Sequence, residues 1–225
     1  YDMRKVIAAF ADKDSVFEVG SAWGESLITA FARVEGRSVG IFANQPLSPR
    51  AGAIDSAAAD KASRFVEWCD TYALPLISFV DNPGYMVGPE AEREGIARHH
   101  ARPLSAIHHR TVPLYTVQLR KAYGLGPFAM SGYGASRNMP ELRVAWPTVE
   151  SGGMSLEGAA YLVKRKEIRI TYHLLRDNKE NILHKPTDDR RFIQGIYKYS
   201  DLDVDVCEGH LSVMTGLNDI CDELM

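Results

Sequence analysis

The sequence predicts a layered α/β domain, and two observations support this fold class. Between residues 27 and 163, apolar segments of strand length alternate with segments of helical periodicity. One strand, residues 75–80, is apolar at nearly every position, as expected of a strand covered on both faces. In such domains the loops at one edge of the sheet carry the chemistry. With 225 residues, the chain can form one large domain, or one domain and an extension.

The amino-terminal elements are expected to be a helix, a short extended segment and a β-hairpin. The helix is predicted over residues 2–10 and the extended segment over 15–19. Residues 27–34 mix β-branched and aromatic side chains, and 38–44 form a compact apolar strand. Glu35-Gly36-Arg37 separates these two strands and is a turn signal, so we expect them to pair as a hairpin.

Residues 55–72 form the clearest predicted helix. Their apolar side chains fall on one stripe, and Asp55 or Ser56 is a good N-cap. Cys69 lies on this stripe, so we interpret it as a buried small hydrophobe rather than a nucleophile.

Two predicted strands end in glycine-bearing turns. The apolar strand runs into residues 81–85, and a helix is expected at 90–102, which Pro103 should end or kink. An alternating strand at 112–119 runs into residues 120–130, which we interpret as a strand-to-helix turn. In such a turn the first N–H groups of the helix have no intrahelical acceptor and can bind an anion or an oxyanion.

The remaining elements are a short strand at 142–146 and a helix at 153–163. From Lys164 onward the chain is strongly charged and its apolar residues are scattered, so we expect one or two peripheral helices, one of them near residues 211–224. No fixed-period repeat is present.

Composition excludes several classes of function. The net charge of −3 gives no overall reason to expect nucleic acid, and no apolar run reaches membrane-spanning length. The three cysteines contain no CxxC pair, and their odd number argues against a disulfide framework, so a reducing compartment is expected. We expect the cytoplasm, with the mitochondrial matrix as the alternative. The chain opens at Tyr1, as if cut from something longer.

Common catalytic motifs are absent: the sequence has no GxSxG, GxxxxGK[ST], HExxH or complete GxGxxG motif. The pairs His99-His100 and His108-His109 have no supporting Cys or Asp cluster at ligand spacing, so we interpret them as partly exposed helix and loop histidines and expect no metal. Asp81 could contact substrate, but we favour an Asx cap that holds the following turn.

With these side-chain motifs absent, the remaining candidates for chemistry are backbone N–H groups. If the two strands are neighbours, the N–H groups of the turns at 83–85 and 124–126 could converge on one oxygen and stabilise an enolate or ureido oxyanion. Sequence spacing alone does not establish that the turns meet.

Several motifs follow one another in order between about Tyr1 and Lys166. The motifs are Phe31-Ala32-Arg33, Glu35-Gly36-Arg37-Ser38-Val39-Gly40-Ile41, Ala43-Asn44-Gln45-Pro46, Ala58-Ala59-Asp60-Lys61-Ala62 with Arg64-Phe65, Asp81 with Pro83-Gly84-Tyr85 and Gly88, Glu94-Gly95-Ile96 with Arg98-His99, and Arg120-Lys121-Ala122-Tyr123-Gly124. Together they resemble the carboxyltransferase component of biotin-dependent acyl-CoA carboxylases, and most closely the β subunits of propionyl-CoA and related acyl-CoA carboxylases.

The resemblance implies a crotonase-like fold, a layered β-β-α superhelix. Residues 1–166 would be a single carboxyltransferase lobe, the second or biotin-side lobe, and residues 167–225 a C-terminal helical extension of unknown role. The implied reaction moves a carboxyl group from carboxybiotin to the α-carbon of an acyl-CoA. The implied partners are a biotin carboxyl carrier or biotin carboxylase subunit and a first, N-terminal lobe. The implied assembly is a homo-oligomer, either a dimer or a trimer of dimers, with no nucleic acid and no membrane.

The resemblance also assigns roles to residues. The amides of Leu125 and Gly126 would form the oxyanion hole for biotin, helped by the Gly84-Tyr85 turn. Phe128 falls at the position that selects the acyl chain. The implied substrate-binding residues are Phe128, Tyr123, Asn44 and Gln45.

The chain departs from the family pattern at this turn. The family usually has Gly-Gly-Ala after Arg-Lys-Ala-Tyr, whereas this chain has Gly124-Leu125-Gly126-Pro127. Leu125 adds a Cβ where glycine allows the closest approach, and Pro127 removes an N–H.

Two alternatives remain open. One is the α-type subunit of a biotin-dependent acyl-CoA decarboxylase, which runs similar chemistry from an acyl-CoA carboxylate to biotin. The other is a non-catalytic paralogue that retains the fold for assembly. A hydratase-type crotonase is disfavoured because no glutamate pair is identifiable.

Overall fold

The computed structural model describes residues 1–132 and 139–164. The chain divides into two compact units, Tyr1–Leu156 and Glu157–Met225. In the second unit, only residues 157–164 are described, and they carry most of helix α6 (Leu156–Val163). The extension expected at 167–225, with its helix near 211–224, therefore lies outside the described residues. The first unit holds every other element described below.

A mixed sheet forms the centre of the first unit. Its strands are β1 (Phe17–Val19), β2 (Leu27–Val34), β3 (Arg37–Asn44), β4 (Leu76–Asn82), β5 (Leu114–Tyr123), β6 (Leu142–Ala145) and β7 (Glu150–Gly152). The spatial order is β1-β2-β3-β4-β5-β6. β6 pairs with residues 115–118 of β5, and β7 pairs with residues 121–123, farther along the same strand. β1, β2 and β3 pair antiparallel, which confirms the expected hairpin, and all later pairs are parallel.

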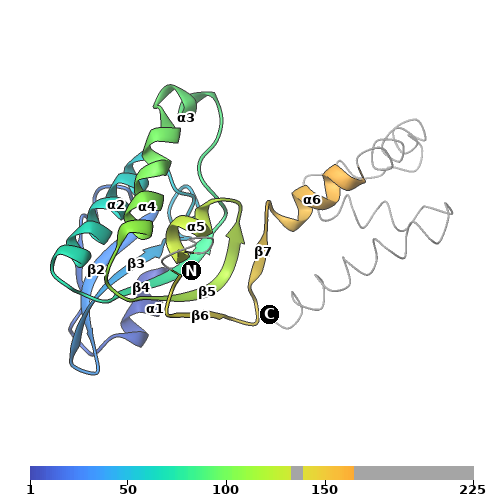
Figure 1. Ribbon diagram of the computed structural model, residues 1–225. Helices are drawn as coiled ribbons and strands as arrows, with labels where there is room; N and C mark the ends of the chain where they lie inside the picture. The colour runs from blue at the N-terminus through green and yellow to red at the C-terminus, as the bar shows by residue number, and fades with distance from the viewer. Residues whose placement is uncertain (133–138, 165–225) are drawn as a thin grey trace, which may run out of the picture. The chain divides into compact units, whose positions relative to one another are not determined.

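Helices cover both faces of this sheet. They are α1 (Met3–Phe10), α2 (Ser56–Thr71), α3 (Pro89–Arg93), α4 (Ile96–His109) and α5 (Gly126–Ser131). α2, α4 and α5 share one core with alternate residues of β3, β4 and β5, and α1 packs with the intervening residues on the opposite face. Figure 1 shows α2 and α4 side by side over their face of the sheet. The predicted layered α/β class is confirmed.

The contact between α2 and the sheet depends on a glycine in β3. A Cβ on Gly40 would lie 2.3 Å from Sγ of Cys69, so only glycine lets α2 approach this closely. Cys69 is fully buried, and burial raises the pKa of its thiol to about 12. The interpretation of Cys69 as a structural hydrophobe is confirmed. Asp55 caps α2 by accepting a hydrogen bond from the Ala58 amide at 2.7 Å, as expected.

Three predicted boundaries are wrong. The helix expected at 90–102 is two helices, α3 and α4, separated by Gly95 in a left-handed conformation (φ 73°). Of the two outcomes expected at Pro103, an end of the helix is not observed, because α4 continues through Pro103 to His109. The strand expected to end at residue 119 continues to Tyr123, so the glycine turn after it is shorter than expected. In addition, β7 was missed, and α6 begins at Leu156 rather than at residue 153.

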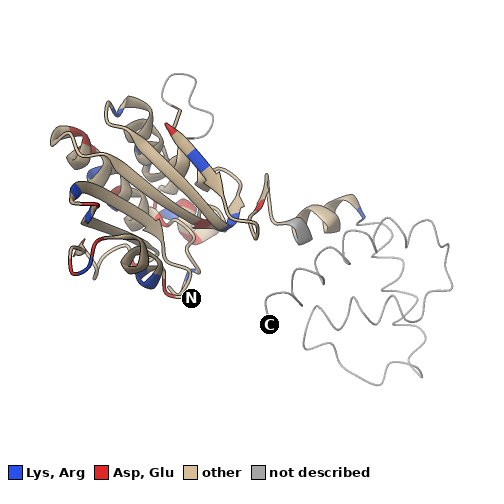
Figure 2. Ribbon diagram, turned by 90° about the horizontal axis from the view of Figure 1, so that it is seen from below, with Lys and Arg blue, Asp and Glu red and all other residues tan. Residues whose placement is uncertain are grey.

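Charges of both signs are interspersed over the described residues, mainly on helices and turns (Figure 2). No described helix is long and apolar enough to cross a membrane.

Candidate active site

The two glycine turns lie at the same edge of the sheet, because β4 and β5 are parallel neighbours. Gly84 follows β4 with φ 126°, and Gly124 follows β5 with φ 63°. Both angles are positive, so glycine is the favoured residue at each turn. The turns also lie close together: a Cβ built on Gly84 would lie 3.7 Å from the carbonyl oxygen of Tyr123, the residue before the second turn. Convergence of the two turns required the strands before them to be neighbours, and β4 and β5 are paired in the structure.

A register shift brings the end of β5 toward β4. Val80 pairs with Gln118, whereas Asn82 pairs with Ala122, so β5 has two extra residues in this interval. Asp81 lies within the shift and is fully buried. Its Oδ1 accepts a hydrogen bond from the Lys121 amide at 3.2 Å, which ties the shifted part of β5 to β4.

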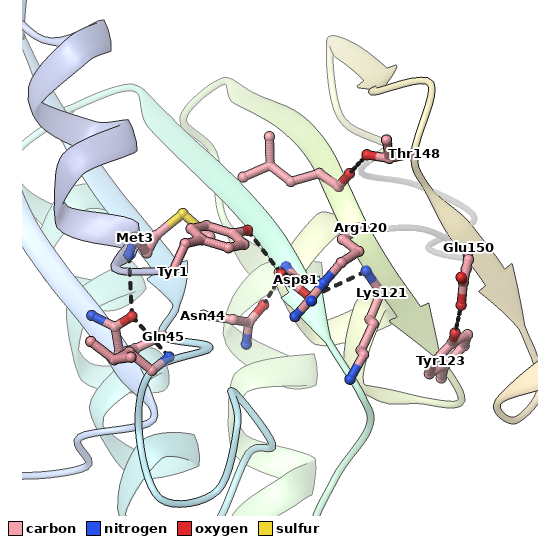
Figure 3. A network of polar contacts seen from close by, with 12 residues as sticks. Tyr1, Met3, Asn44, Gln45, Asp81, Arg120, Lys121, Tyr123, Thr148 and Glu150 are labelled. Atoms are coloured by element: carbon pink, nitrogen blue, oxygen red, sulfur yellow. Dashed lines mark hydrogen bonds and ion pairs between the residues drawn. The ribbon is translucent and has the colours of Figure 1, made fainter. Parts of the chain in front are cut away.

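Asp81 is the centre of a polar network at this edge (Figure 3). Its Oδ2 accepts hydrogen bonds from the Tyr1 hydroxyl at 2.8 Å and from Nε of Arg120 at 3.2 Å. Burial, with the Asp81 carboxylate next in importance, raises the pKa of Tyr1, so this hydroxyl stays protonated and remains a donor. The Asp81 carboxylate thus joins the amino terminus, β4 and β5.

The Asx cap of the first turn belongs to Asn82, not to Asp81. Oδ1 of Asn82 accepts a hydrogen bond from the Gly84 amide at 2.6 Å, two residues on. The interpretation of Asp81 as this cap is wrong, because its carboxylate turns instead toward Tyr1, Arg120 and Lys121. The adjacent polar residue carries the role that the sequence motif indicated.

Three backbone amides at these turns have no hydrogen-bond acceptor among residues 1–132 and 139–164: those of Tyr85, Leu125 and Gly126. The neighbouring amides are occupied, since Gly84 donates to Asn82 and Gly124 donates to the carbonyl of Gly152 at 2.9 Å. Leu125 is the N-cap of α5, and its side chain is half exposed. Grouped amides without acceptors suit an oxygen that carries negative charge.

The comparisons with known proteins identify the family. A model of the carboxyl transferase domain matches residues 1–205. The chain belongs to this family. The match reaches beyond Lys166, where the resemblance noted in the sequence ends.

The relatives of this carboxyl transferase domain confirm the resemblance. It is 47% identical over 170 residues to the 12S subunit of methylmalonyl-CoA carboxyltransferase from Propionibacterium freudenreichii, covering 75% of this chain and 32% of that subunit. It is 44% identical to the α subunit of methylmalonyl-CoA decarboxylase from Veillonella parvula, covering 74% of this chain and 32% of the relative. It is 40% identical to the propionyl-CoA carboxylase β chain of Saccharopolyspora erythraea, covering 75% of this chain and 30% of the relative. The chain therefore spans about a third of the length of these relatives.

The structural comparison confirms the crotonase-like fold. A solved structure of the transcarboxylase 12S protein, a hexamer with methylmalonyl-CoA bound, aligns with a TM-score of 0.69 and 46% identity. The alignment covers 75% of this carboxyl transferase domain and 32% of that chain.

Two of the expected substrate-binding residues, Asn44 and Gln45, have backbone partners. Asn44 is fully buried; its Nδ2 donates to the Gly52 carbonyl at 3.2 Å and its Oδ1 accepts from the Asp81 amide at 3.3 Å. Gln45 accepts from the Met3 amide at 3.1 Å and donates to Asp2 at 2.6 Å. Both side-chain carboxamides fix the loop after β3, and Gln45 also ties the start of α1 to this loop.

The other expected residues, Tyr123 and Phe128, flank the second turn. Tyr123 ends β5, is buried, and donates its hydroxyl hydrogen bond to the carboxylate of Glu150 in β7. Phe128 lies in α5 and is partly exposed. Because no strand is predicted at residues 150–152, no sequence pattern indicates the Tyr123–Glu150 contact.

Tyr85 packs against a histidine of α4. Its ring stacks on His100 with centroids 3.6 Å apart. Burial lowers the pKa of His100 to about 4 and raises that of Tyr85, so both side chains are uncharged at neutral pH. His99 is also partly exposed, and His108 and His109 are exposed; all four lie on α4 rather than partly on a loop. Nowhere in the described ranges do three or more potential metal ligands lie together.

Proposed function

We propose that this chain is the biotin-side lobe of an acyl-CoA carboxyltransferase. The observation that carries the proposal is the group of amides without acceptors in the described residues, on Tyr85, Leu125 and Gly126, at the sheet edge where β4 and β5 end. Such donors are suited to the ureido oxygen of biotin, on which negative charge develops as the carboxyl group departs. The substrates would be carboxybiotin, delivered by a carrier protein, and an acyl-CoA thioester such as propionyl-CoA.

When bound, carboxybiotin would supply the carboxyl group that is transferred to the α-carbon of the acyl-CoA. The residues of this chain contribute electrostatics and position. The Leu125 and Gly126 amides would donate to the ureido oxygen, and the Tyr85 amide would donate from the neighbouring turn. The Gly84 amide supports the turn rather than the ligand, because Asn82 accepts its hydrogen bond.

The acyl chain would contact the second turn. Phe128 lies two residues beyond Gly126 on α5 and is partly exposed, so its ring can bound a pocket for the acyl group. Tyr123, on the strand before the turn, would close the same region. Asn44 and Gln45 would act on substrate indirectly, through the loop that they hold.

The partners belong to the same proposal. A first, N-terminal lobe would bind the acyl-CoA opposite this lobe, and a biotin carboxyl carrier or biotin carboxylase subunit would supply the carboxybiotin. A homo-oligomer, either a dimer or a trimer of dimers, would bring the lobes of different subunits together. The buried Cys69 thiol is consistent with a reducing compartment, either the cytoplasm or the mitochondrial matrix.

The test is a transfer assay on this chain joined to a complete first lobe. Incubation with radiolabelled carboxybiotin and a series of short and medium acyl-CoAs is expected to label at least one acyl-CoA. Absence of label in every acyl-CoA, by an assembly with an intact fold, would contradict the enzymatic proposal and favour a role in assembly alone.

A second candidate is the reverse direction, decarboxylation of an acyl-CoA carboxylate with transfer to biotin. The similarity to a methylmalonyl-CoA decarboxylase α subunit favours it. The same assembly would then release carboxyl from methylmalonyl-CoA to biotin, and proton consumption with a membrane partner would depend on sodium. Failure of this assembly to carboxylate biotin from methylmalonyl-CoA would reject this candidate.

A further inference from the structure

The Asn82 side chain lies between the two glycine turns. It is the last residue of β4 and is completely buried. Its Oδ1 holds the first turn through the Gly84 amide, at 2.6 Å. Its carboxamide also lies against Gly126, the first residue of α5 in the second turn. One side chain therefore contacts both turns that carry the proposed oxyanion donors.

The contact with Gly126 leaves no room for a side chain there. A Cβ on Gly126 would lie 2.6 Å from Oδ1, 2.7 Å from Nδ2 and 2.8 Å from Cγ of Asn82. These three similar distances mean that the flat carboxamide faces the Cα of Gly126. Any larger residue at 126 would have to displace either Asn82 or the start of α5. The glycine at this position therefore has a steric cause.

The Nδ2 of Asn82 is buried and has no hydrogen-bond partner among the described residues. Leaving such a donor unsatisfied costs stability. A leucine, valine or alanine at 82 would avoid this cost but could not accept the Gly84 hydrogen bond. The carboxamide is thus explained by its contacts with the two turns rather than by the stability of the core.

We infer that Asn82 is a positioning residue for carboxyl transfer, matched in size to Gly126, that sets the spacing between the Tyr85 amide and the Leu125 and Gly126 amides. The inference rests on the proposed function, since the amides matter only if an oxyanion forms there. Asn82 acts through the backbone of the turns and does not itself react.

Two pairs of variants test the inference in the assembled enzyme. Asn82→Ala removes the acceptor for the Gly84 amide, whereas Asn82→Ser keeps a short oxygen that can accept this hydrogen bond. Asn82→Ala is expected to lower kcat about 10- to 100-fold, since small misplacements of catalytic groups have effects of this size, with little change in KM for acyl-CoA. Asn82→Ser is expected to recover most of the lost kcat. Equal kcat values in Asn82→Ala and wild type would overturn the positioning role.

The second pair tests the size match. Gly126→Ala is expected to lower both Tm and kcat, because its Cβ meets the Asn82 carboxamide. Adding Asn82→Ala to Gly126→Ala removes the overlap and is expected to restore Tm toward wild type, while kcat stays at the level of Asn82→Ala. A double variant no more stable than Gly126→Ala would overturn the size match.

The outcomes separate this inference from the proposed function. If wild-type enzyme fails to transfer carboxyl, the proposed function and the positioning role both fail, and the Tm values still decide whether residues 82 and 126 are matched. If wild type is active and Asn82→Ala is equally active, the proposed function stands and only the positioning role fails.

Discussion

Nε of Arg120 lies 3.2 Å from Oδ2 of Asp81 at the edge of the sheet where both glycine turns emerge. The carboxylate is fully buried, whereas the arginine side chain is 44% exposed. The pair therefore joins a buried charge on β4 to a guanidinium on β5 that reaches solvent. Together with the Lys121 amide, it fixes the register shift that precedes the second turn.

Asp81→Asn is expected to destabilise the domain by about 2 kcal/mol, since hydrogen bonds to a charged group are each worth roughly 1.5–3 kcal/mol. The substitution keeps the shape of the side chain but weakens its hydrogen bonds from Tyr1, Arg120 and Lys121. Urea unfolding measures the effect. Asp60→Asn is the matched control, because Asp60 pairs with Arg102 at a more exposed position and should cost less. An Asp81→Asn variant as stable as wild type would show that the Asp81 network adds no stability.

Lys61 predicts a pH dependence of stability. Its side chain is buried and donates to the Leu27 carbonyl at 2.7 Å, and burial lowers its pKa from 10.5 to about 8. Between these two values the unfolded chain binds more protons than the folded chain, so the free energy of unfolding contributed by Lys61 rises with pH in this window.

The measurement compares wild type with Lys61→Met by urea unfolding on either side of about pH 9. The stability of wild type relative to the variant is expected to increase at the higher pH. Lys13→Met removes a lysine charge at an exposed position and serves as control. A difference between wild type and Lys61→Met that does not change with pH would argue against the lowered pKa.

Phe128→Ala is expected to change the acyl preference of the assembled enzyme. Removing the ring enlarges the proposed pocket, and pocket changes of a methylene or more alter selectivity by about 10-fold or greater. The ratio of kcat/KM for medium-chain acyl-CoA to that for propionyl-CoA should rise. Trp68→Ala, which removes an exposed aromatic ring on α2, should leave the ratio unchanged. An unaltered ranking in Phe128→Ala would remove this residue from the pocket.

Local patterns in the sequence predicted the sheet and its covering helices well. The apolar run of β4 and the stripe of α2 are visible because burial on one or both faces leaves a clear periodicity. The end of β5 was harder to predict, since Arg120 and Lys121 are polar and suggest a turn. They remain in the strand because Asp81, about 40 residues away, accepts hydrogen bonds from both.

Partners that are distant in sequence also explain the missed parts of the site. The hypothesis that the strands before the two turns are neighbours is confirmed by the parallel pairing of β4 and β5. The roles of Asp81 and Asn82 could not be separated from sequence, because both can cap a turn and only the fold shows which carboxyl or amide faces Gly84. The steric need for glycine at 126 depends on the same long-range contact with Asn82.

The most direct test of the central claim removes one proposed oxyanion donor without adding bulk at Gly126. Leu125→Pro does this: Leu125 has φ −82°, near the value that proline requires, and its amide has no acceptor in the described part of the chain. Gly126→Pro is less suitable, because its ring would overlap Asn82. Leu125→Ala keeps the amide and is the control.

The quantity to measure is kcat for carboxyl transfer from carboxybiotin to propionyl-CoA by this chain joined to a first lobe, with Tm recorded for each variant. Leu125→Pro is predicted to lower kcat by about 100-fold or more, as removal of one oxyanion donor does elsewhere, while Leu125→Ala stays near wild type. A folded Leu125→Pro enzyme with wild-type kcat would contradict the assignment of this turn as the oxyanion hole.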